Sequence, residues 1–128
     1  MSLKDTLRVM VVDDMTVSRG LVTQALEELG VWQIATENSG ASALSRLAAD
    51  PVHLVLADYN MPGMDGLQLL EGLRRNRSTQ RIGYILVTGT PTPELIQKGQ
   101  KLGLNNLVRK PFTTATMKKA IEAVVGRL

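Results

Sequence analysis

The sequence contains no cysteine among its 128 residues. This absence excludes thiol nucleophiles, cysteine-ligated metal sites and a disulfide framework. A chain of this length buries roughly two-thirds of the surface that its unfolded state exposes, so it needs neither a disulfide nor a structural zinc ion. We therefore expect a single domain over residues 1–128 and a cytoplasmic location.

Long apolar runs and aromatic side chains are also scarce. No run approaches the ~20 residues that span a membrane. The N-terminus carries Lys4, Asp5 and Arg8 and lacks the apolar region of a signal peptide. Aromatic residues make up 3% of the chain, which leaves few groups to stack on nucleic-acid bases.

The charge is unevenly distributed along the chain. Residues 1–64 contain four Lys/Arg and eight Asp/Glu, whereas residues 65–128 contain eleven and four. The basic second half indicates an anionic partner, which could be nucleic acid, an acidic protein or a phosphate donor. A solvated surface of mixed charge is the alternative.

Short apolar runs alternate with segments of helical spacing, which predicts an α/β domain. Three runs are continuous and aliphatic, as in strands buried on both faces, and two are weaker and typical of edge strands. This predicts the flavodoxin-like fold: a five-stranded parallel sheet of order 2-1-3-4-5 with five helices on both faces. The expected strands are, in order, Val9–Val12, Trp32–Thr36, Val52–Ala57, Tyr84–Val87 and Leu107–Val108.

Polar residues stand just beyond the carboxyl ends of four of these strands. Ligands of open α/β sheets bind beyond the carboxyl ends of the strands, so we expect these side chains to converge at one edge of the sheet. They are Asp13 and Asp14, Asp58, Thr88 and Lys110.

Three clustered carboxylates repel one another by about 1–4 kcal/mol per pair at 4 Å, and a bound cation relieves this repulsion. Oxygen ligands favour a hard ion, so we predict Mg²⁺. An isolated Asp-Asp pair could instead be an exposed, helix-capping turn. If a carboxylate carried a phosphoryl group, Lys110 could supply a second cation and Thr88 a hydroxyl donor, and Gly89 leaves space beside them.

Four motifs together resemble the two-component response-regulator receiver domain of the CheY-like kind. The resemblance covers about residues 6–127 and rests on Val11–Asp14, Asp58–Gly66, Val87–Gly89 and Lys110–Phe112.

This resemblance implies that Asp58 is the phosphoacceptor. Asp14 would bind Mg²⁺ directly and Asp13 through water, and the main-chain carbonyl of Asn60 would be a further ligand. Thr88 and Lys110 would hold the phosphoryl oxygens.

The resemblance also implies the partners. The phosphoryl donor would be a phosphohistidine on a sensor histidine kinase or a phosphotransfer domain. As a stand-alone bacterial receiver, the chain would switch the binding of a partner protein, as in chemotaxis, or act as a phosphorelay intermediate or phosphate sink. The docking face expected from the family carries basic side chains here: Lys98, Lys101, Arg109, Lys118 and Lys119.

One position departs from the family pattern. Leu107 stands where the family usually has Tyr or Phe, three residues before the lysine. Leucine cannot rotate a ring or offer a hydroxyl, so this receiver could switch atypically. Tyr84 and Phe112 are the other nearby aromatic residues, and both are better explained by packing.

Two other functions fit less well. A phosphatase that forms an aspartyl-phosphate usually has a general-acid Asp two residues after the nucleophile, but Asn60 occupies that position. We therefore expect a phosphoacceptor switch rather than an enzyme. Nucleic-acid binding through the basic half lacks any recognition motif.

Overall fold

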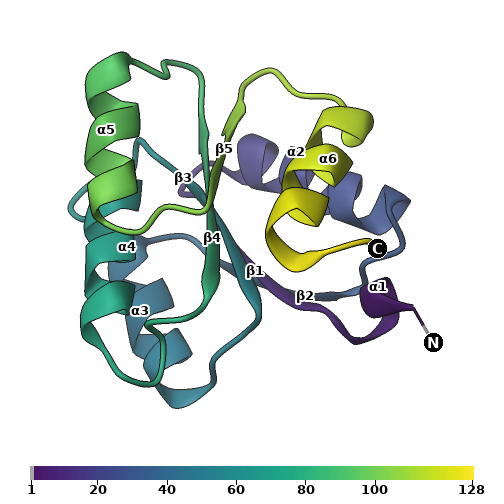
Figure 1. Cartoon of the computed structure of the whole chain (residues 1–128), viewed down its shortest axis with the longest axis horizontal. Helices are drawn as coiled ribbons and strands as arrows, with labels where there is room; N and C mark the ends of the chain where they lie inside the picture. The colour runs from purple at the N-terminus through teal and green to yellow at the C-terminus, as the bar shows by residue number, and fades with distance from the viewer. Residues whose placement is uncertain (1) are drawn as a thin grey trace.

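The computed structural model describes residues 2–128, which form a central sheet covered by helices on both faces (Figure 1). The strands are β1 (Arg8–Val12), β2 (Gln33–Glu37), β3 (Leu54–Asp58), β4 (Gly83–Thr88) and β5 (Asn106–Arg109). The helices are α1 (Leu3–Thr6), α2 (Thr16–Glu28), α3 (Gly40–Ala49), α4 (Gly66–Arg75), α5 (Pro93–Lys101) and α6 (Thr114–Val125).

All strand pairs are parallel, and the order is β2-β1-β3-β4-β5. The predicted strand order and the two predicted edge strands are therefore confirmed. Strands β1, β3 and β4 are buried along nearly their whole length, whereas β2 and β5 are largely exposed or half-buried. The burial agrees with the uninterrupted aliphatic character of the three central strands.

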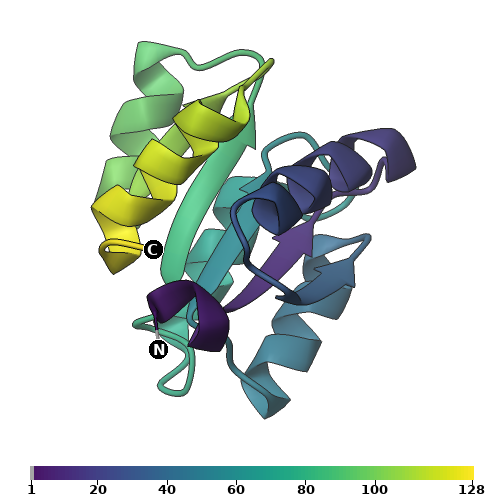
Figure 2. The same ribbon diagram turned by 90° about the vertical axis from the view of Figure 1, so that its right-hand side faces the viewer.

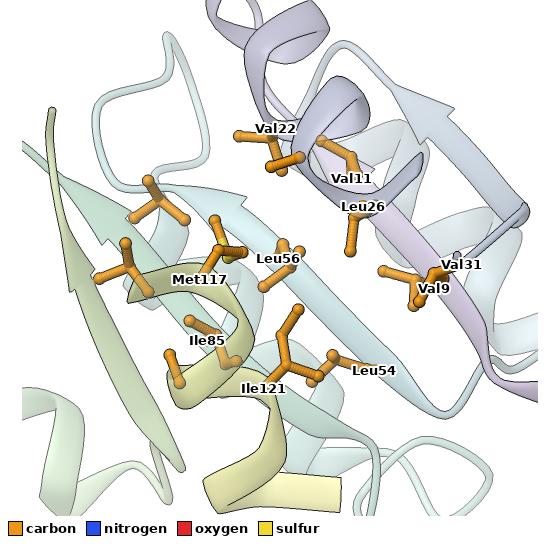
Figure 3. Packing of buried hydrophobic residues seen from close by; sticks show 14 of the residues in the cluster. Val9, Val11, Val22, Leu26, Val31, Leu54, Leu56, Ile85, Met117 and Ile121 are labelled. Carbon is orange, nitrogen blue, oxygen red and sulfur yellow. The ribbon is translucent and has the colours of Figure 1, made fainter. Parts of the chain in front are cut away.

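Two apolar layers flank the sheet. Helices α2 and α6 cover one face, where Leu26 and Ile121 pack over Leu56 and Ile85 (Figures 2 and 3). Helices α3, α4 and α5 cover the other face, where Leu47, Leu70 and Leu95 pack against alternate residues of the same strands. Alternation along each strand thus divides its side chains between two cores.

Helix α1 is an element that the sequence did not predict. Its four residues are too few to show an apolar period, and none of them is buried. A capping box formed by Ser2 and Asp5 defines it locally. Side chains also cap two longer helices: the Asp65 carboxylate accepts the amides of Leu67 and Gln68 at the start of α4, and Thr92 caps α5 with Pro93 in its first turn.

No helix within residues 2–128 is long and apolar enough to cross a membrane.

Candidate functional site

The carboxyl ends of β1 and β3 bring three carboxylates together. One carboxylate oxygen from each of Asp13, Asp14 and Asp58 lies within 4.8 Å of the others. β1 and β3 are hydrogen-bonded neighbours with Val12 opposite Ala57, so the residues that follow them meet at one edge of the sheet. The predicted convergence of the acidic residues is confirmed.

The three carboxylates differ in environment. Asp13 is buried, and its Oδ1 accepts the amide of Met15 at 3.0 Å. Asp14 is exposed to solvent, and the Asp58 side chain is 11% exposed. The cluster therefore combines one buried, one nearly buried and one accessible carboxylate, an arrangement that a cation can reach from solvent.

Lys110 joins the cluster from the end of β5. Its Nζ donates to Asp58 Oδ1 at 2.5 Å and lies 4.0 Å from Asp13 Oδ2. One ammonium therefore faces three carboxylates, which leaves the cluster with excess negative charge. Lys110 precedes Pro111 in a cis peptide bond, and its amide donates to the carbonyl of Thr88 at 2.8 Å.

Burial raises the pKa of Asp58, and the hydrogen bond from Lys110 opposes this effect. The charges of Asp13 and Asp14 raise the pKa of Asp58 further. The free-energy cost of desolvating the charged carboxylate thus exceeds the stabilisation that the single ammonium provides. This imbalance favours the binding of a second cation near Asp58.

Thr88 lies at the end of β4, next to the strand that carries Asp58. It is 1% exposed, and its Oγ1 accepts the amide of Thr90 at 3.1 Å. The hydroxyl hydrogen remains available to a group bound at Asp58. Gly89 is exposed, and a side chain there would meet nothing within 4 Å, which agrees with the space predicted beside Thr88.

Asn60 lies on the exposed loop between β3 and α4. The loop begins at Tyr59, whose amide donates to the Val87 carbonyl at 3.1 Å. Gly63 has a φ of +77°, a left-handed conformation that glycine adopts without strain. The loop thus turns sharply just after Asn60 and returns to α4.

The site includes two residues that the sequence analysis missed. Ser18 Oγ accepts Lys110 Nζ at 3.0 Å, and Arg19 Nη1 donates to the Asp13 carbonyl at 2.8 Å. Both come from the first turns of α2, which begins at Thr16 beside the site. No sequence signal distinguishes Ser18 from an ordinary surface serine, because its role depends on which way the helix faces.

Oxygen donors alone make up the carboxylate cluster, so its chemistry fits Mg²⁺. The close spacing of the three carboxylates, the excess negative charge of the cluster and the accessibility of Asp14 also favour binding of Mg²⁺. The side chains present can therefore hold a divalent cation beside Asp58.

Comparison with known proteins gives a consistent result. The family model described as "Response regulator receiver domain" matches residues 9–122. The chain is 41% identical over 128 residues to a probable chemotaxis protein CheY of Rhizobium etli, covering 100% of this chain and 99% of that protein. It is 30% identical over 126 residues to chemotaxis protein CheY-3 of Vibrio cholerae, covering 98% and 97%.

Solved structures share the fold. Chemotaxis protein CheY4 of Vibrio cholerae superposes with a TM-score of 0.86 at 26% identity, over 93% of this chain and 98% of that one. The receiver domain of a Pseudomonas aeruginosa sensor histidine kinase, solved with a magnesium ion in its active-site cleft, gives 0.84 at 20% identity. That comparison covers 94% of this chain and 98% of the kinase domain.

Proposed function

The chain belongs to the response regulator receiver domain family, and from this premise we propose that it is a phosphorylation-controlled signalling switch. In this proposal Asp58 accepts a phosphoryl group from the phosphohistidine of a sensor histidine kinase or phosphotransfer domain. The observation that carries the proposal is the position of Lys110 Nζ, 2.5 Å from Asp58 Oδ1 inside a cluster of three carboxylates.

The transfer forms a bond between an Asp58 oxygen and phosphorus, while the bond between phosphorus and the histidine nitrogen breaks. The electron pair of the broken bond stays on the imidazole. Phosphoryl transfer depends on alignment and charge stabilisation more than on acid–base groups. In this proposal Lys110 and the Thr88 hydroxyl bind the phosphoryl oxygens, and the hydrogen bond from Lys110 to Ser18 orients the ammonium.

The proposed metal ligands are Asp14 directly, Asp13 through water, Asp58, and the main-chain carbonyl of Asn60. Bound Mg²⁺ would neutralise part of the negative charge on Asp58 and on the incoming phosphoryl group. The excess of carboxylates over the one ammonium supports this assignment. So does the magnesium ion in the structurally similar kinase receiver domain.

A surface suited to the phosphoryl donor adjoins the site. Met15, the N-cap residue of helix α2, and Val17 and Leu21 within α2 are exposed at 62%, 76% and 55%. Exposed apolar side chains grouped on one element mark an interaction surface. We propose that the donor protein covers these side chains while its phosphohistidine reaches Asp58.

The proposed output surface lies across α5, β5 and α6. Its basic residues are all exposed, and within residues 2–128 none has a carboxylate oxygen within 4.0 Å: Lys98, Lys101, Arg109, Lys118 and Lys119. An acidic partner surface fits this face. The resemblance to CheY proteins supports a chemotaxis partner, such as a flagellar motor protein, over a phosphorelay or phosphate-sink role.

Read-out must work without an aromatic residue at position 107. Leu107 is half-buried and lines a notch of about 190 Å³ with Ile96 and Leu104. Phe112 packs against the α2/α6 core and Tyr84 is fully buried, so neither ring stands free on this face. We propose that switching proceeds through Thr88 and the adjoining loop, without movement of a ring.

The function is tested by incubation with acetyl phosphate and Mg²⁺, followed by intact-mass measurement. We expect one added phosphoryl group, no addition after chelation of Mg²⁺, and none in Asp58→Asn. Asp50→Asn is the matched control, because Asp50 is an exposed carboxylate paired with Arg8 outside the site. Labelling that persists in Asp58→Asn, or that needs no divalent cation, contradicts the proposal. Steady turnover of a separate phosphate ester would instead indicate a hydrolase.

A further inference from the structure

We propose that Tyr84 is a positioning residue for the loop of residues 59–65, which follows Asp58 and carries Asn60. Tyr84 lies on β4 and is 0% exposed. Its hydroxyl donates to the carbonyl of Gly66, the first residue of α4, at 2.6 Å. The side chain thus ties the interior of the sheet to the point where the loop enters the helix.

The two ends of this loop are fastened together. The amide of Gly66 donates to the carbonyl of Tyr59 at 2.9 Å, and the amide of Tyr59 donates to the carbonyl of Val87 at 3.1 Å. With the Tyr84 hydroxyl, these bonds form a closed base for the loop, attached to β4 at two points. We call these four residues, Tyr59, Gly66, Tyr84 and Val87, the loop base.

The loop base is in direct contact with the phosphoacceptor. A Cβ on Gly66 would lie 2.6 Å from the Asp58 carbonyl oxygen and 3.1 Å from the Tyr59 Cα. The backbone of Gly66 is therefore packed against the peptide of Asp58. Any displacement of Gly66 is transmitted to Asp58 and to Tyr59, the neighbour of Asn60.

The hydroxyl at position 84 calls for an explanation other than packing. Tyr84 belongs to a core whose other strand residues are aliphatic, Met10, Val55 and Leu86 among them. A buried hydroxyl costs free energy unless it is hydrogen-bonded. Burial also raises the pKa of Tyr84 well above its ordinary value, so the phenol stays a neutral donor to Gly66.

The experiment compares Tyr84→Phe with Thr79→Val. Thr79 is also 0% exposed, and its hydroxyl donates to the Leu73 carbonyl at 2.7 Å, near the other end of α4. Both variants lose one buried hydroxyl-to-carbonyl bond to the same helix. Only Tyr84 adjoins the proposed metal-binding loop.

Two quantities are measured. In metal-free protein, hydrogen exchange of the amides at residues 59–66, all except Pro62, reports how well the loop is held. Calorimetric titration with MgCl₂ gives the magnesium dissociation constant. We expect Tyr84→Phe to speed the exchange and to weaken Mg²⁺ binding, each by about fivefold, the factor for one ordinary hydrogen bond. Thr79→Val should leave both unchanged while lowering the free energy of unfolding.

This inference rests on the proposed Mg²⁺ site, and the outcomes separate the two. If the wild-type chain binds no Mg²⁺, the proposed function fails. If the wild type binds Mg²⁺ but Tyr84→Phe matches it in both measurements, the positioning role alone is overturned. Equal effects in both variants, or failure of Tyr84→Phe to fold, would mean that the hydroxyl only stabilises the fold.

Discussion

At the scale of single residues, Asp58 is a carboxylate whose proposed role needs the charged form, although its burial disfavours that form. Its pKa is raised mainly by burial, and Lys110 only partly offsets this effect. A raised pKa in the folded state means that the fold tolerates neutral Asp58 better than charged Asp58. The contribution of neutral Asp58 to the free energy of unfolding is fully present below the ordinary Asp pKa of 3.8. This contribution is lost as the pH rises through the folded-state pKa.

Asp58→Asn should therefore stabilise the metal-free protein at neutral pH, because it removes a charge that is costly to bury. The advantage over wild type should shrink as the pH falls toward the ordinary carboxyl value. Urea unfolding with a chelator present, at a series of pH values, measures it. Glu37, whose pKa is lowered by Arg46, is common to both proteins and cancels in the difference. An advantage that grows on acidification would contradict this account.

The residues whose convergence at one sheet edge was predicted from the sequence share one property. The Asp13-Asp14 pair and Asp58 follow apolar runs directly, and Lys110 follows one after Arg109, so the strand pattern alone predicted their meeting at one edge. Arg74 shows why others were missed. The arginines that follow Leu73 in the sequence predict a solvated helix end, but Arg74 is half-buried and donates to the carbonyls of Ile82 and Gly103. Its partners lie on segments whose positions only the tertiary structure determines.

At the scale of elements, the start of α4 is the tightest junction near the site. Gly66 has backbone or side-chain atoms of Asp58 and Leu86 at 2.6 Å from the position of a Cβ. Gly20, by contrast, lies within α2 and has nothing within 4 Å of that position. The two helical glycines therefore make a matched pair.

Gly66→Ala should lower the free energy of unfolding by about 1–3 kcal/mol, as overpacking of a well-packed core does. Gly20→Ala should raise it by roughly 0.5–1 kcal/mol, because alanine is the better helix former. Urea denaturation of both variants and wild type tests this. A Gly66→Ala protein as stable as wild type would show that the junction can move, and would weaken the argument for the loop base.

Element identity was predictable where burial leaves a clear pattern. Strands β1, β3 and β4 were recognised because burial on both faces demands continuous apolar residues. The inner face of α3 is less predictable: the apolar spacing from Ala41 to Ala48 predicts that both alanines face the core, but both are exposed, whereas Ala43 is buried. Alanine contributes little to an apolar period, so neighbouring alanines leave the register of a helix ambiguous.

At the scale of the whole molecule, the two charges of the sequence occupy different regions. The acidic cluster at the ends of β1 and β3 is the proposed metal site. The basic side chains of α5, β5 and α6 lie on the exposed surface across which we propose that a partner docks. The net charge of +3 therefore conceals an acidic cluster and a separate basic surface, joined by β5, which carries Arg109 and leads directly to Lys110.

This separation leads to a prediction about binding to an output protein, for which a flagellar motor protein is the proposed probe. Reversing two charges on the docking face, in Lys98→Glu/Lys119→Glu, should weaken binding several-fold, mainly through slower association. Arg77→Glu is the control, because Arg77 is exposed in the turn after α4, outside that face.

Wild-type affinity should fall with added salt, because the Debye length shrinks to about 10 Å at 0.1 M. The salt dependence should be shallower in the double variant, while labelling by acetyl phosphate stays intact because neither lysine contacts the carboxylate cluster. Equal loss of binding in Arg77→Glu would show that net charge, rather than this face, governs recognition.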